Sequence, residues 1–110
     1  MAHDSLLCPK FEQAFQVIGK KWNGLIIEVL LNGETHFSRI SATIPEMSDR
    51  MLAARLRELE QLNVVKREVD TGYPVRVCYS LTEKGRQLAP VLKEVHRWAD
   101  RWARPGADEL

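Results

Sequence analysis

The sequence predicts a mainly α-helical domain that carries one small β-hairpin, an α+β fold. Two features of the sequence lead to this prediction. Apolar residues recur every three or four positions in segments between residues 9 and 62 and in a long segment after residue 82, which is the period of an amphipathic helix. Residues 63–82 instead contain β-branched and aromatic residues in partial alternation around a turn-forming stretch at residues 70–74, which is typical of two paired strands.

The composition fits one globular domain in a chain of 110 residues. Hydrophobic residues make up 45% of the chain and charged residues 28%, so a core can form without a disulfide or a metal. The formal net charge is only +1. Any nucleic-acid-binding surface must therefore be a local concentration of Lys and Arg, with the acidic residues placed elsewhere.

The cysteines and histidines predict neither a disulfide framework nor a metal site. Cys8 and Cys78 are 70 residues apart, which suits a reducing compartment, and the three histidines are scattered. No glycine-rich phosphate loop and no Ser/His/Asp set with a supporting context occurs. We therefore expect no enzyme activity, no cofactor and no metal.

The sequence predicts a cytoplasmic protein without a membrane partner. The longest apolar run, residues 25–31, is interrupted by Glu28 and is too short to cross a bilayer. The first ten residues lack a cationic stretch followed by an apolar one, so we expect no export signal.

Two helices are predicted within residues 8–32. Pro9 is favourable at the first helical position, which makes Cys8 the expected N-cap, and Gly19 ends this helix. The second helix is expected over residues 22–31, with residues 32–33 closing it. Apolar residues expected on one face of the first helix are Phe11, Ala14, Phe15 and Ile18, and those expected to point inward from the second are Leu25, Ile26, Val29 and Leu30.

Two further helices with a tight connection predict a helix-turn-helix. The third helix is expected over residues 37–44, where Pro45 stops it. Three residues then precede Ser48, a favourable N-cap for the fourth helix. Such a short turn between amphipathic helices is the geometry of a helix-turn-helix. The inward residues are expected to be Phe37, Ile40 and Ile44 in the third helix, and Met51, Leu52, Leu56 and Leu59 in the fourth.

A hairpin and a long last helix complete the chain. The hairpin is expected to turn near Gly72. Thr82 is the expected cap of a helix that runs from Glu83 to about Arg104, with a kink near Arg86 caused by Pro90. Its apolar residues follow 4,3,4,3 spacing, which suits packing against another helix: Leu88, Leu92, Val95, Ala99 and Trp102, with Val91 and Trp98 beside them.

This order of elements is that of a winged helix-turn-helix, with the hairpin as the wing. We expect a single domain, residues 1–110, with N-terminal helices at 8–32, the helix-turn-helix at 36–62, the wing at 63–82 and a dimerisation helix at 83–104. The last helix has more apolar surface than one small domain needs. The first and last helices are therefore the expected interface of a two-fold dimer.

The sequence resembles the HxlR-type winged helix-turn-helix transcriptional regulators over nearly all of residues 8–98. The motifs that carry the resemblance are CP at 8–9, IGKKW at 18–22, FSRI at 37–40, PEMSDRMLAARLREL at 45–59, a strand entry at 64–67 and YPVRVCYSLTEKGR at 73–86. The chain departs from the family at residues 19–20, where two glycines are frequent. The resemblance implies a homodimer that binds inverted-repeat operators in double-stranded DNA as a repressor or an activator, often of oxidoreductase or stress-response genes.

The outer face of the fourth helix is the first candidate for contact with DNA. The side of this helix opposite the apolar stripe carries Arg50, Ala54 and Arg57. The two arginines can reach a guanine edge or a phosphate there, and the small side chain of Ala54 allows DNA to approach the helix closely. Arg55 lies toward the flank and is expected to pair with Glu58 or Glu60. The plain alternative is a surface helix with solvated arginines.

Other polar residues are candidates for contact with the DNA backbone. Ser48 and Asp49 begin the fourth helix, although Ser48 is also explained as a cap. Ser38 and Arg39 begin the third helix, which crosses the phosphates in this motif. Arg76 follows the hairpin turn, where a wing reaches phosphates or the minor groove, and its alternative is a solvent-facing strand residue.

Cys8 is a candidate redox sensor. A thiol at a helix N-cap faces the positive end of the helix dipole, which favours the thiolate. Its position matches the N-terminal cysteine that several proteins of the resembled family use to sense oxidants or electrophiles. The alternative is a small N-cap residue packed at the dimer interface, and Cys78 can face either side of its strand.

Two other functions remain open from the sequence. The first is a winged-helix module that binds another protein through the fourth helix. The second is a thiol redox switch that does not itself recognise DNA. Its affinity for DNA would not depend on salt, whereas a protein that contacts phosphates releases counterions and binds more weakly as salt rises. The leading hypothesis is a dimeric DNA-binding repressor that responds to an oxidant or a small molecule.

Overall fold

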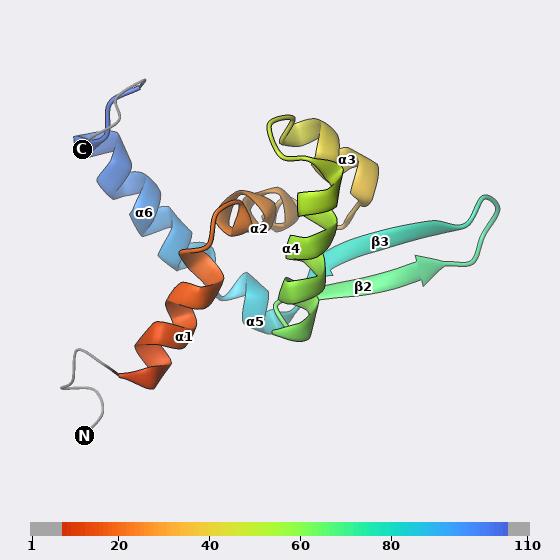
Figure 1. Cartoon of the computed structure of the whole chain (residues 1–110), viewed down its shortest axis with the longest axis horizontal. Helices are drawn as coiled ribbons and strands as arrows, with labels where there is room; N and C mark the ends of the chain where they lie inside the picture. The colour runs from red at the N-terminus through yellow and green to blue at the C-terminus, as the bar shows by residue number, and fades with distance from the viewer. Residues whose placement is uncertain (1–7, 106–110) are drawn as a thin grey trace.

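The computed structural model describes residues 8–105, and the winged helix-turn-helix prediction is confirmed (Figure 1). Helices α1 (Pro9–Ile18) and α2 (Asn23–Leu31) are followed by strand β1 (Thr35–His36), α3 (Phe37–Thr43) and α4 (Asp49–Gln61). Strands β2 (Val65–Asp70) and β3 (Arg76–Leu81) then form the hairpin, and α5 (Glu83–Arg86) and α6 (Ala89–Trp102) end the described chain. The hairpin extends from one end of the molecule, and α1 and α6 lie at the other end (Figure 1).

The N-terminal helices begin and end close to the predicted positions. Cys8 is the N-cap of α1 and Gly19 its C-cap, with Pro9 in the first turn. Helix α2 begins at Asn23, one residue later than predicted, and residue 32 caps its C-terminus. Gly33 then adopts a φ of 129°, a left-handed conformation that glycine tolerates best, and this turns the chain into β1.

The helix-turn-helix has the predicted caps. Ser48 Oγ accepts a hydrogen bond from the Met51 amide at 3.1 Å, which satisfies one of the free N–H groups at the start of α4. Helix α3 ends at Thr43, one residue earlier than predicted, and Ile44 is its C-cap. The predicted inward residues Leu52, Leu56 and Leu59 are fully buried, whereas Met51 is 36% exposed at the edge of the stripe.

The sheet has three strands rather than the two predicted. Strand β3 pairs antiparallel with β2 on one side and with β1 on the other, in the order β1-β3-β2. The short strand β1 aligns Thr35 with Tyr79 and His36 with Cys78. Two residues are too few to show alternation, so this strand could not be predicted from the sequence.

The predicted single C-terminal helix is in fact two helices. Thr82 caps α5 as predicted, since its hydroxyl oxygen accepts a hydrogen bond from the Gly85 amide at 3.1 Å. However, α5 ends at Arg86, and α6 begins at Ala89 with Pro90 in its first turn. A proline has no N–H and its ring would clash with the carbonyl of residue 86 in a continuous helix, so the chain breaks instead of kinking.

The core lies between α2, α4 and the sheet. Its fully buried side chains include Ile26, Ile27, Ile40, Leu52, Leu56, Leu59, Val64 and Val65. The inward assignment of Leu25 in α2 was wrong: Leu25 is 51% exposed, and Ile27 takes the buried position instead. Because α2 is apolar on nearly every side, its period does not identify the buried face.

Replacing Gly85 with Ala is expected to destabilise the protein by about 1–3 kcal/mol, because it overpacks a closed site. A Cβ atom there would press on the Val64 carbonyl oxygen and lie 3.0 Å from Leu81 Cδ2. Equilibrium unfolding in urea measures the change. Gly24→Ala is the matched control, since its Cβ would have only ordinary contact, 4.0 Å from Leu92 Cδ2. An equal loss of stability in both variants would contradict the expectation.

Candidate DNA-binding surface and thiol sites

Helix α4 presents two exposed arginines on its outward face. Arg50 and Arg57 are exposed, and Ala54 between them is half-buried. Within residues 8–105, neither arginine has a carboxylate within ion-pair distance. Two turns of helix separate them, a spacing of about 10 Å along the axis. Both guanidinium groups are therefore available to an external partner, as predicted from the helical period.

Arg55 is held in an internal ion-pair cluster, which agrees with its predicted pairing. Its Nη1 lies 2.9 Å from Glu58 Oε1, and Lys20 Nζ approaches the same oxygen at 2.9 Å. The hydrogen bond from Lys20 lowers the pKa of Glu58 most, and Arg55 adds to this effect. The cluster joins the turn after α1 to the flank of α4 and does not include the outward arginines.

The lowered pKa of Glu58 predicts a pH-dependent stability. Because the folded-state pKa lies below the unfolded one, the stabilisation is present above the unfolded value and is lost as pH falls through the folded value. Glu58→Gln should lower the free energy of unfolding at neutral pH, with a difference from wild type that shrinks in acid. Urea titrations over a pH series measure this. A constant difference across the series would contradict the assignment, and Glu60→Gln on the same helix is the control.

The predicted backbone-contacting residues lie on three separate elements. Ser38 and Arg39 are exposed in the first turn of α3, and Arg76 is exposed at the start of β3. Ser41 at the end of α3 donates a hydrogen bond to Asp49 Oδ1 at 2.6 Å, which ties α3 to the first turn of α4. This hydrogen bond gives Asp49 a structural role within the protein, and capping of α4 gives one to Ser48.

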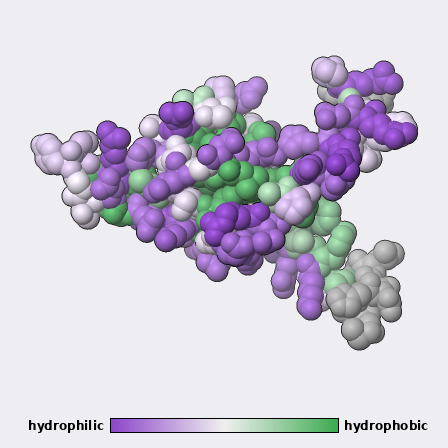
Figure 2. All heavy atoms as spheres, turned by 180° about the vertical axis from the view of Figure 1, so that it is seen from behind, coloured by the Kyte–Doolittle hydropathy of each residue, from purple (hydrophilic) through white to green (hydrophobic). Residues whose placement is uncertain are grey.

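An apolar surface runs over α1 and α6, at the end opposite the hairpin. None of the residues of α1 is buried, and Leu92 is the one buried residue of α6. Large side chains that are about half exposed or more include Phe11, Phe15, Val95, Trp98 and Trp102. We call these five residues the terminal apolar surface. In the view of Figure 2, apolar side chains also gather across the middle of the molecule, whereas the hairpin tip is mostly hydrophilic to neutral.

The two thiols lie in different environments. Cys8 is buried at the N-cap of α1, and its side chain makes no capping hydrogen bond. Cys78 is half-buried on β3, with its Sγ 3.4 Å from His36 Nδ1. Burial raises the pKa of the Cys78 thiol, and the Glu34 carboxylate raises it further. The sequence did not indicate this Cys–His contact, because it depends on the unrecognised pairing of β1 with β3.

The described part of the chain contains neither a membrane-spanning helix nor a cluster of metal ligands. No helix within residues 8–105 is both long and apolar enough to span a membrane. The same residues contain no group of three or more His, Cys, Asp or Glu side chains arranged to hold a metal ion.

Comparison with known proteins identifies the family. The family model described as HxlR-like helix-turn-helix matches residues 17–107, most of the chain. The chain belongs to the HxlR-like helix-turn-helix family. This confirms the resemblance seen in the sequence motifs, and it agrees with the order of helices and the wing in the structure.

The similar proteins of this family are named transcriptional regulators rather than enzymes. The chain is 52% identical over 100 residues to the HTH-type transcriptional regulator YodB of Bacillus subtilis, covering 91% of this chain and 89% of YodB. It is 48% identical to YvaP of the same organism, an uncharacterized HTH-type transcriptional regulator, over 94% of this chain and 95% of YvaP.

Solved structures of similar regulators share the fold of the chain. The reduced form of B. subtilis YodB matches with a TM-score of 0.81 at 52% identity, covering 91% of this chain and 98% of that one. The redox regulator HypR in its oxidized form matches with a TM-score of 0.79 at 37% identity, covering 84% and 95% of the two chains.

Proposed function

We propose that this HxlR-like regulator is a homodimer that binds an inverted-repeat operator in double-stranded DNA and represses transcription in the cytoplasm. Each protomer would insert α4 into the major groove. The observation that carries the proposal is the pair of exposed arginines, Arg50 and Arg57, without carboxylate partners among the described residues on the outward face of an anchored helix. In this proposal the segments keep their predicted roles: the N-terminal helices are residues 8–32, the DNA-reading helix-turn-helix is 36–62, the wing is 63–82 and the dimerisation helix is 83–104.

The outward face of α4 suits the edges of bases. The arginine spacing of about 10 Å matches roughly three base pairs at about 3.4 Å each. A guanidinium group can donate two hydrogen bonds to O6 and N7 of guanine, which is the commonest specific contact in the major groove. Ala54 lies between them and has no bulky side chain to hold the helix away from the bases.

The other candidate residues would fix the position of the protein on the phosphates. Ser38 and Arg39 begin α3, Ser48 and Asp49 stand at the start of α4, and Arg76 lies on the wing. The amide groups at the start of a helix attract a phosphate. Asp49 would repel one, so its proposed role is limited to bases that donate a hydrogen bond, such as cytosine N4.

The terminal apolar surface supports the proposed dimer through α1 and α6. Apolar patches of this kind on a small domain usually mark an interface. In Figure 1 these helices lie at the opposite end from the hairpin, so a partner packed there would leave α4 and the wing open. A two-fold dimer then presents two copies of α4 to two half-sites.

Salt-dependent DNA binding tests the proposal and separates it from both alternatives. Fluorescence anisotropy on the intergenic DNA next to the protein's own gene should show specific binding that weakens steeply with salt, because bound phosphates release counterions. A protein-binding module would show no preference for this DNA over a scrambled duplex. A thiol switch without its own DNA reading would show an affinity that does not change with salt.

We also propose that Cys8 carries a response to oxidants or electrophiles. Its place at the N-terminus of α1, beside the terminal apolar surface, supports this role, because a change at the thiol would act directly on the proposed dimer interface. The similar structures include YodB in reduced, diamide-treated and quinone-bound forms and HypR in oxidized and reduced forms. These states belong to those proteins, and the proposal extends the sensitivity to this chain.

Treatment with a thiol oxidant is expected to change the affinity of the wild-type protein for its DNA by at least about tenfold, or 1.4 kcal/mol, a common size for coupling between two sites. The Cys8→Ser variant should keep its affinity under the same treatment. Anisotropy with and without oxidant, followed by reduction, measures the effect. If the oxidant does not change the DNA affinity of the wild-type protein, oxidant sensing by Cys8 is refuted and the DNA-binding proposal is unaffected.

A further inference from the structure

We propose that Cys78 and His36 form a second thiol site, distinct from Cys8, that adds small uncharged α,β-unsaturated carbonyl compounds. The site lies at the junction of β1 and β3, which the register places side by side through the pair His36 and Cys78. Its parts are a nucleophile, a base at hydrogen-bond distance, a group that orients the base and an open cleft. These are the parts that an activated thiol requires.

The base is oriented toward the thiol by the backbone. His36 Nδ1 lies 3.4 Å from Cys78 Sγ and 3.3 Å from the carbonyl oxygen of Val77. With the ring proton on Nε2, Nδ1 can accept the proton of the Cys78 thiol. Once Nδ1 carries that proton, it can donate a hydrogen bond to the Val77 carbonyl oxygen, which stands at hydrogen-bond distance.

The thiol needs this base because its surroundings disfavour a free thiolate. Burial raises the pKa of Cys78, and the carboxylates of Glu34, Asp70 and Glu68 raise it further. Glu34 precedes β1, and Asp70 and Glu68 belong to β2; the charged group facing the site from α3 is Arg39. Lys66 pairs with Glu68 at 3.4 Å and Arg76 lies opposite Asp70, so basic groups offset two of these carboxylates. The Glu34 carboxylate remains beside the half-buried thiol, which favours an uncharged electrophile over an anionic one.

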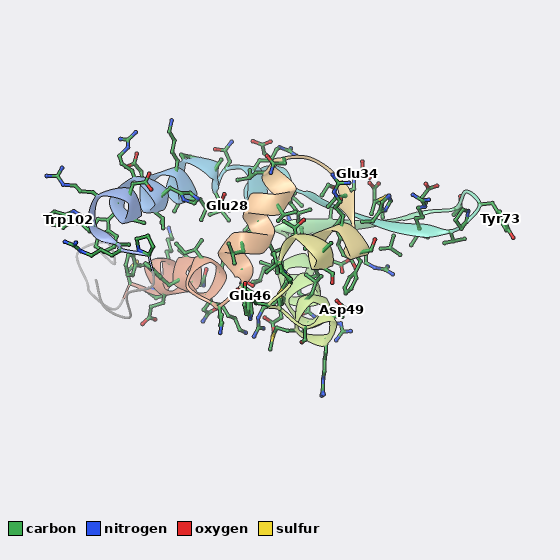
Figure 3. All side chains as sticks on the ribbon, turned by 90° about the horizontal axis from the view of Figure 1, so that it is seen from above. Glu28, Glu34, Glu46, Asp49, Tyr73 and Trp102 are labelled. Carbon is green, nitrogen blue, oxygen red and sulfur yellow. The ribbon has the colours of Figure 1, made fainter. Side chains whose placement is uncertain are left out.

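The cleft beside the thiol is large enough for such a reagent. It has a volume of about 740 Å³ and is lined by residues from the end of α2, β1, α3, β2 and β3. In Figure 3, Glu34, which lines the cleft, and Asp49, at the start of α4, lie on opposite sides of the hairpin. A compound can therefore reach Cys78 without passing the outward face of α4.

The proposed addition needs no oxidant. The thiol proton moves to His36 Nδ1, and the sulfur forms a bond to the β-carbon of the reagent. The π electrons of the C=C bond move to the carbonyl group as an enolate, which then takes a proton from the protonated ring or from water. The net change is the addition of S–H across the double bond.

The reaction rate with N-ethylmaleimide tests the site. In Cys8→Ser protein, labelling of Cys78 measured by mass spectrometry should be about 10²-fold faster than in Cys8→Ser/His36→Asn, the low end for a positioned base. Cys8→Ser/His96→Asn, which changes a histidine on α6, is the matched control and should react like Cys8→Ser. Equal rates in all three proteins would overturn the proposal.

The pH profile of Cys8→Ser gives a second test that does not depend on a variant of His36. With the base in place, the labelling rate should rise less steeply with pH than the thiolate fraction of a thiol of raised pKa. A rate that instead rises steadily with the fraction of a thiolate of raised pKa would overturn the role of His36. A doubly substituted Cys8→Ser/Cys78→Ser protein should remain unlabelled in both experiments.

An adduct on Cys78 is expected to weaken DNA binding, an expectation that rests on the proposed function. His36 is the N-cap of α3, and Arg39 in the first turn of that helix lines the same cleft. Filling the cleft should shift this turn and its proposed phosphate contacts. Cys8→Ser protein labelled at Cys78 should bind several-fold more weakly than the unlabelled protein. Unchanged affinity would overturn this coupling, while the labelling rates judge the site without any DNA.

Discussion

Replacing both Arg50 and Arg57 with Ala is expected to reduce the affinity for the operator by about 2–6 kcal/mol, since each bidentate contact with guanine contributes about 1–3 kcal/mol. The two side chains lie about 10 Å apart along α4 and share no partner in the described chain, so their effects should add. Affinity for a scrambled duplex should fall much less, because that binding depends on the phosphates. Anisotropy on both duplexes measures the two losses.

A matched control separates lost contacts from lost charge. Lys93→Ala with Arg97→Ala also removes two positive charges, but from an exposed face of α6 turned away from the terminal apolar surface. This variant should bind the operator nearly as well as wild type. If the two double variants lose equal affinity, net charge rather than α4 governs binding, and the assignment of α4 is wrong.

Placing a carboxylate within the terminal apolar surface is expected to give a monomer. Val95 on α6 is 54% exposed in the single chain, so Val95→Glu should fold normally. In the proposed dimer the same carboxylate would be buried without a partner, which costs several kcal/mol. Operator affinity should then fall by about 10²–10⁴, because two linked half-site contacts become independent.

Analytical ultracentrifugation together with anisotropy measures both consequences of Val95→Glu. Lys93→Glu introduces the same group on the opposite face of α6 and should remain a dimer with operator affinity close to that of wild type. A Val95→Glu protein that is still dimeric would show that the interface lies elsewhere. A monomer that binds the operator with full affinity would contradict the need for two half-sites.

The sequence was sufficient where local chemistry determines structure. The helix-turn-helix was predictable because Pro45 ends α3 and Ser48 caps α4 through its own hydroxyl group. The outward position of Arg50 and Arg57 follows from the helical period once the leucine stripe is assigned to the core. The ion pair of Arg55 with Glu58 follows from the same spacing.

Features that depend on tertiary contacts were not predictable. Strand β1 exists because β3 offers it a free edge, which two residues of sequence cannot indicate. The sequence predicts a kink where α5 and α6 are in fact separate helices, since Pro90 is compatible both with a bent helix and with the start of a new one. The contact between His36 and Cys78 joins residues 42 apart, and it could be found only after the strand pairing was known.

Hydroxyl-radical footprinting of the wild-type protein on its own intergenic DNA tests the central claim most directly. Two copies of α4 related by a two-fold axis should protect two symmetric half-sites whose centres are about 10 base pairs, or a multiple of that, apart. The Arg50→Ala/Arg57→Ala protein should lose this pattern at the same concentration. A single asymmetric protected region, or a symmetric pattern that persists without the two arginines, would contradict the claim that α4 reads the operator.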